Sequence, residues 1–168
     1  MRKPSGKYTW FLVPAIIVVF FACTTQQPQA EMKQEDIDRV EALDEREYVF
    51  VAKQVSPQRG GMWPLTTYYD MVVSADSVNA QLPYFGRAFT APLDPWDGGI
   101  SFISTDFAYQ EKRNNKGRWT IEIEPRDEQD IRRLILTVFT NGDATLRVSS
   151  LNREMITFNG HVEPRIRN

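Results

Sequence analysis

The chain has 168 residues, of which 42% are hydrophobic and 25% are charged. These values are those of an ordinary globular domain and exclude a disordered protein, which carries too few apolar residues to build a core. The formal net charge of −2 argues against a nucleic-acid-binding protein, because such proteins need a basic surface to neutralise phosphates.

Residues 1–22 have the pattern of a secretory signal peptide. Three basic residues and no acidic ones precede Trp10, and residues 10–22 form an apolar run broken only by Pro14. A membrane-spanning helix needs about 20 apolar residues, so this shorter run fits the hydrophobic part of a cleaved signal better. An uncleaved signal anchor or a buried apolar helix is the alternative.

Cys23 is the only cysteine of the chain and directly follows this run. Its position after Phe20-Phe21-Ala22 is similar to the lipobox of bacterial lipoproteins. The resemblance implies that the thiol carries a diacylglyceryl group with palmitate-type chains and that Cys23 becomes the new N-terminus. Several acyl chains on one residue give durable attachment to a membrane, which a single chain does not. We therefore expect the membrane to be a partner through Cys23.

Residues 23–30 are expected to form the lipidated N-terminus and a short tether, since Thr, Gln and Pro28 replace the apolar residues there. In enteric-type sorting an Asp after the cysteine favours the inner membrane, whereas Thr24 stands there in this chain. The resemblance therefore implies an outer-membrane lipoprotein that faces the periplasm. No acidic cluster of the kind that directs some lipoproteins to the cell surface accompanies Cys23.

Residues 31–55 are predicted to form an N-terminal helix, because Glu, Asp, Lys, Arg, Ala and Leu dominate there. Apolar residues recur at helical spacing through this segment and would form one stripe along the helix: Ile37, Val40, Leu43, Phe50 and Val51. Glu47 falls within the stripe, so either its carboxylate is paired or the helix is interrupted at that point.

Residues 56–168 alternate between apolar and polar positions and predict a β-rich domain. The expected strands are 66–73, 78–82, 100–109, 118–124, 134–140, 143–149 and 155–160. Asn141-Gly142 predicts a hairpin with a type I′ turn, which needs positive φ at both residues. We expect an α+β fold that is mainly β: an antiparallel meander of about seven strands forming a curved sheet, barrel or sandwich, with one helix, in a single globular unit 31–168.

Residues 84–99, here called the aromatic loop, form a long segment without clear periodicity. Loops of this length in compact domains are usually functional or packed on themselves. Tyr84, Phe85 and Trp96 are candidates for an apolar binding surface, and Arg87 is a candidate cation for a carboxylate or a protein partner. The partner would be an envelope protein, a glycan or a lipid. The alternative is that these aromatic residues only cap an open end of the sheet.

Several runs of residues, taken together, resemble one bacterial protein family. They are Val72–Val78, Leu82–Ala88, Gly99–Phe102, Trp119–Ile121 and Arg153–Gly160. The family is catalogued as a domain of unknown function, DUF4251, is frequent in the Bacteroides group and often carries lipoprotein signals. The resemblance covers about residues 46–163 and implies a fold and an envelope location, but no catalytic residues and no ligand.

Signatures of an enzyme, a metal site or a cofactor are sparse. His161 is the only histidine and is expected to be a solvated residue near a strand end, so an ordinary zinc site cannot be assembled. Two pairs of acidic residues support the alternative of a carboxylate-dependent hydrolase, if either pair converges in a cleft: Glu122 with Glu124, and Asp94 with Asp97. We expect a binding or assembly module rather than an enzyme, with no cofactor.

Overall fold

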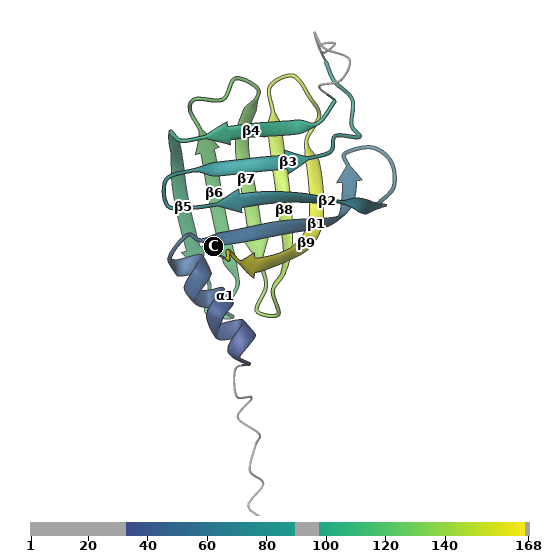
Figure 1. Cartoon of the computed structure of the whole chain (residues 1–168). Helices are drawn as coiled ribbons and strands as arrows, with labels where there is room; N and C mark the ends of the chain where they lie inside the picture. The colour runs from purple at the N-terminus through teal and green to yellow at the C-terminus, as the bar shows by residue number, and fades with distance from the viewer. Residues whose placement is uncertain (1–32, 90–97, 167–168) are drawn as a thin grey trace, which may run out of the picture. The chain divides into compact units, whose positions relative to one another are not determined.

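The computed structural model describes residues 33–89 and 98–166, and the structural statements below concern these residues. One helix precedes nine strands (Figure 1). Their bounds are α1 Gln34–Asp44, β1 Tyr48–Pro57, β2 Trp63–Val73, β3 Val78–Leu82, β4 Ile100–Ser104, β5 Phe107–Arg113, β6 Trp119–Pro125, β7 Ile131–Val138, β8 Asp143–Ser150 and β9 Ile156–Pro164. None of the described helices is long and apolar enough to cross a membrane.

All nine strands belong to one antiparallel sheet, in the order β4-β3-β2-β1-β9-β8-β7-β6-β5. In Figure 1 the strands β1 to β4 cross in front of β5 to β8, so the sheet curls over itself into a nearly closed barrel. The edge strands β4 and β5 follow each other in the chain but have no pairing with each other among the described residues. The predicted mainly β, antiparallel fold with one helix is confirmed, with nine strands in place of about seven.

The barrel interior is a packed apolar core. In β6, Trp119, Ile121 and Ile123 are buried and alternate with residues on the outer face, as the two-residue period of a strand requires. The largest side chains that are fully enclosed come from helix α1 and six of the nine strands, and they include Tyr48, Phe50, Met71, Ile121, Leu134, Leu146 and Phe158.

The predicted helix 31–55 is wrong in its second half, because α1 ends at Asp44 and residues 48–57 form β1. β1 pairs with β2 on one side and β9 on the other, and this double ladder outweighs local helix propensity. Phe50 and Val51 extended the helical stripe only by coincidence, since both are buried strand residues on opposite faces. Glu47 lies outside the helix and is paired, with Arg165 at 3.3 Å.

Helix α1 ends in a Schellman motif, in which a residue in the left-handed conformation follows the last turn. The amide of Glu47 donates to the carbonyl of Ala42 at 2.8 Å and the amide of Arg46 donates to Leu43 at 3.2 Å. Arg46 has φ of +58°, where glycine is usual. Its guanidinium lies 4.3 Å from the ring centroid of Tyr109 in β5, so a cation–π contact joins the helix end to the barrel.

The predicted strand 100–109 is two strands, β4 and β5, separated by a corner at residues 104–106. The carboxylate of Asp127 holds this corner: it accepts hydrogen bonds from the buried hydroxyl of Ser104, from the amide of Thr105 at 2.8 Å and from the amide of Asp106 at 3.1 Å. The Ser104 hydroxyl, followed by these amides, lowers the pKa of Asp127 to about 2. Three consecutive polar residues, Ser104-Thr105-Asp106, interrupt the alternation at this corner, and the prediction of one strand overlooked this local turn signal.

The hairpin between β7 and β8 is confirmed, but its turn is not the predicted type I′. Among the described non-glycine residues only Arg46 has positive φ, so Asn141 does not have it, while Gly142 has φ of +87°. The amide of Gly142 donates to the carbonyl of Phe139 at 3.0 Å, which describes a type I turn followed by a glycine bulge. Gly142 also accommodates Arg39, whose Cζ would lie 2.5 Å from any Cβ at that position.

Candidate functional site

The first part of the aromatic loop is joined to the connection between β8 and β9. Ala88 forms an isolated antiparallel bridge with Arg153. The amide of Phe89 donates to the carbonyl of Asn152 at 2.7 Å, and the amide of Glu154 donates to the carbonyl of Arg87 at 2.9 Å. This part of the loop therefore behaves as a short extra strand held at one end of the barrel.

Tyr84 anchors the loop through its hydroxyl. The Tyr84 Oη lies 2.7 Å from the carbonyl oxygen of Arg87 and 3.0 Å from that of Glu154. Burial raises the pKa of Tyr84, and the nearby charge of Glu154 adds to the effect. Gly86 makes this geometry possible, because a Cβ there would lie 2.4 Å from the Tyr84 Oη. Within the Leu-Pro-Tyr-Phe-Gly-Arg run, the tyrosine therefore anchors the loop and the glycine leaves space for the tyrosine hydroxyl.

Arg153 connects both ends of the loop. Its Nη1 donates to the carbonyl of Gly99 at 2.5 Å, its Nε lies 3.3 Å from Oδ2 of Asp130, and its guanidinium lies 5.2 Å from the ring centroid of Tyr84. The next residue, Glu154, is 3.7 Å from Arg59 in the β1–β2 connection. Sequence reasoning missed Arg153 as a site residue, although it begins the Arg153–Gly160 motif.

Large apolar side chains remain exposed at this end of the barrel. Phe85 is 56% exposed and Phe89 is 69% exposed, and Arg87 is also exposed. The β1–β2 connection with the start of β2, and the β8–β9 connection, lie beside the loop and add further exposed apolar side chains: Met62, Trp63, Leu151 and Met155. We call this set of exposed residues the aromatic end. Exposed apolar groups that gather in this way make the aromatic end a candidate interaction surface.

The structure treats the four predicted contact residues differently. Phe85 and Arg87 are exposed on the loop, whereas Tyr84 is partly buried against the core and positions its neighbours. Trp96 lies outside the described residues, as does Cys23. The structure therefore brings three of the predicted residues together at the start of the loop.

Of the two acidic pairs predicted for a hydrolase, the one that the structure describes forms ion pairs with an arginine. Arg133 binds Glu122 at 2.9 Å and Glu124 at 2.8 Å on the outer face of the sheet. Asp94 and Asp97 lie outside the described residues. Within residues 33–89 and 98–166, no group of three or more His, Cys, Asp and Glu side chains is arranged to hold a metal ion.

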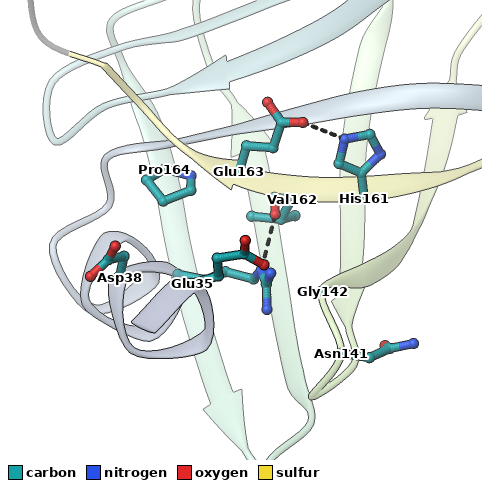
Figure 2. Close-up of a pocket in the computed structure, with 9 residues that line it drawn as sticks. Glu35, Asp38, Asn141, Gly142, His161, Val162, Glu163 and Pro164 are labelled. Atoms are coloured by element: carbon teal, nitrogen blue, oxygen red, sulfur yellow. Dashed lines mark hydrogen bonds and ion pairs between the residues drawn. The ribbon is translucent and has the colours of Figure 1, made fainter. Parts of the chain in front are cut away.

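A hollow of about 430 Å³ lies between α1, the β7–β8 turn and the end of β9. Figure 2 shows Glu35 and Asp38 of the helix on one side and His161 with Glu163 on the other. His161 Nε2 lies 2.5 Å from Oε1 of Glu163. The histidine is therefore paired with a neighbouring carboxylate near the end of β9. Arg39 donates from Nε to the carbonyl of Val162 at 3.1 Å, so this hollow is the joint between helix and barrel.

Comparison with known proteins agrees with this architecture. The crystal structure of a DUF4251 family protein from Bacteroides eggerthii is similar, with a TM-score of 0.57 and 18% sequence identity over 77% of this chain and 87% of the other. At that identity the likeness concerns the fold alone. No curated protein matches the chain. The family model for the domain of unknown function DUF4251 matches residues 29–162, and the chain therefore belongs to the DUF4251 family.

Proposed function

We propose that the protein is a lipid-anchored module of the bacterial envelope whose aromatic end binds a partner protein. The observation that carries the binding role is the exposure of Phe85 and Phe89 on a loop held by Tyr84 and Arg153. A surface that is fixed before binding loses little conformational entropy when a partner arrives. Arg87, exposed between the two phenylalanines, supplies a cation for a carboxylate of the partner.

The anchoring part of the proposal is supported by the sequence of residues 1–30. The apolar run, the single Cys23 after it and the polar tether together match a lipoprotein signal. Cys23→Ser is expected to release the protein from the membrane fraction, and mass spectrometry of the wild type is expected to show an acylated N-terminus at residue 23. An unmodified full-length N-terminus in the cytosol would contradict the anchoring.

The binding part is tested by photo-crosslinking in intact cells. A photoreactive amino acid at position 85 is expected to give one discrete crosslinked product. The same residue at position 139 is the control, because Phe139 is also exposed, at 41%, but precedes the β7–β8 turn, at the other end of β8 from the β8–β9 connection.

The product is expected to disappear when Phe89→Ala is added, since the two phenylalanines belong to one surface. Equal crosslinking at positions 85 and 139, or none at either, would refute a dedicated binding surface at the aromatic end. Because the assay reports contact and not membrane attachment, it separates failure of binding from failure of anchoring.

A further inference from the structure

A second hollow, of about 590 Å³, lies on the outer face of β1 to β4. Strand register aligns its floor: Ile103 is opposite Asn79, Asn79 is opposite Val72, and Val72 is opposite Val49. Glu163 of β9 continues the row beyond Val49. Strands in a sheet are about 4.8 Å apart, so a row across five strands is about 19 Å long. We call this hollow the outer groove.

Large apolar side chains along the outer groove are exposed. Tyr68 and Ile103 are each 66% exposed and Ile166 is 85% exposed. Burial, with the charges of Asp70 and Glu163, raises the pKa of Tyr68, so its hydroxyl lies near both carboxylates. The groove thus combines a flat aromatic face with a polar edge.

The floor contains a polar atom without a hydrogen-bond partner. Asn79 Oδ1 is buried and no donor among the described residues reaches it. Buried carbonyl oxygens are almost always satisfied, since leaving one unpaired is unfavourable. Asn79 is in the middle of the row, between Val72 and Ile103. An acceptor placed there is suited to a ligand that brings a donor.

The remaining polar groups of the groove restrict the charge and the hydrogen-bonding character of a ligand that could bind there. Glu163 adds an acceptor and the charge of Asp70 lies near Tyr68, whereas the one cation of the lining, Arg165, lies 3.3 Å from Glu47 and is partly neutralised. An anionic ligand is therefore disfavoured, and a donor-rich neutral ligand with apolar faces is favoured. A β-augmenting peptide is also disfavoured, because it would run along the edge strand β4, whereas the groove runs across five strands, four of which already pair on both sides.

We infer that the outer groove is a binding site for a neutral oligosaccharide, which stacks a sugar face on Tyr68 and donates a hydroxyl or amide hydrogen to Asn79. Sugars offer both features, since each ring has apolar C–H faces and several O–H donors around its rim. The length of the row fits a chain of sugar units better than a single unit. This role is separate from the partner surface proposed for the aromatic end.

The test is an array of neutral oligosaccharides, acidic oligosaccharides and basic peptides probed with the full-length chain. Wild type is expected to bind at least one neutral glycan, and Asn79→Leu and Tyr68→Ala are each expected to weaken that binding at least tenfold. Thr120→Ala is the matched control, because Thr120 is exposed on the outer face of β6 outside the groove.

Thermal unfolding shows whether Asn79 has only a structural role. Leu has the same number and branching of side-chain heavy atoms as Asn and removes an unpaired acceptor, so Asn79→Leu is expected to keep or raise the midpoint while losing the glycan. A lowered midpoint would mean that Asn79 stabilises the sheet, and it would overturn the assignment. Binding of no glycan, binding of peptides or acidic glycans only, or glycan binding unaffected by both variants would overturn it as well.

Discussion

Gly160 of β9 is the position where a single added carbon is expected to do most damage to the barrel. It is opposite Ala52 of β1 and Ala144 of β8, so it lies between two strands at the centre of the sheet. The register between β1 and β9 shifts between Ala52 and Gln54, which makes Lys53 an extra residue in β1. At such a bulge the backbone of the longer strand is displaced.

The displaced backbone occupies the space that a side chain at position 160 would need. A Cβ there would lie 1.9 Å from the carbonyl oxygen of Val51, 2.9 Å from its carbonyl carbon and 3.1 Å from Cα of Ala52. All three obstacles are backbone atoms of an interior strand, so no rotamer change relieves them. Overpacking a core costs about 1–3 kcal/mol and occasionally more. Because here the backbone itself must move, we expect Gly160→Ala to lower the free energy of unfolding by about 3 kcal/mol or more.

Chemical denaturation of wild type and variant measures this difference. Gly61→Ala is the matched control, since a Cβ at Gly61 meets nothing within 4 Å, and it is expected to stay within about 0.5 kcal/mol of wild type. An unfolding midpoint of Gly160→Ala equal to that of the control would refute the close approach of β1 and β9.

Three other perturbations test the helix end, the corner and the loop anchor. Arg46→Gly is expected to be more stable than Arg46→Ala by about 1 kcal/mol in thermal unfolding, because only glycine adopts positive φ without strain; equal stability would argue against the left-handed conformation. The folded-state pKa of Asp127, about 2, lies below its unfolded value of about 3.9, so its contribution to stability is complete above that value and is lost as the pH falls towards 2. Denaturation curves of wild type and Asp127→Asn are therefore expected to converge between pH 4 and pH 2, and a constant gap would exclude this linkage. Tyr84→Phe is expected to cost about 1 kcal/mol and to speed amide hydrogen exchange at Phe89, whereas unchanged exchange would show that the hydroxyl does not hold the loop.

The parts of the fold that were predictable from sequence are those fixed by neighbouring residues. Apolar and polar residues alternate in 118–124 and 143–149, which indicates strands with one buried face, and both segments are strands in the structure. A glycine after Asn141 marked the hairpin correctly. The turn type was wrong because Asn-Gly fits both a type I′ turn and the last two positions of a type I turn with a bulge.

The parts that were missed depend on residues far away in the chain. Tyr48–Pro57 becomes a strand because β9, about a hundred residues later, completes its second ladder. The corner between β4 and β5 has a local signal in Ser104-Thr105-Asp106, but the carboxylate that accepts its amide hydrogen bonds is that of Asp127. In the same way, the role of Tyr84 depends on Glu154, which is 70 residues distant. Local composition and periodicity do not show which distant residues come into contact, so these features could not be predicted from them.

The exposure of the two loop phenylalanines also bears on whether the aromatic loop is only a cap. A cap explains Tyr84, whose ring packs against the core. It does not explain Phe85 and Phe89, which stay more than half exposed although burying a phenylalanine stabilises a fold by about 1.5–3 kcal/mol. The hydrogen bonds of Tyr84 and Arg153 fix the backbone that presents these rings to solvent. The exposure of these two rings on a backbone held by hydrogen bonds therefore supports the binding role proposed above over closure of the barrel alone.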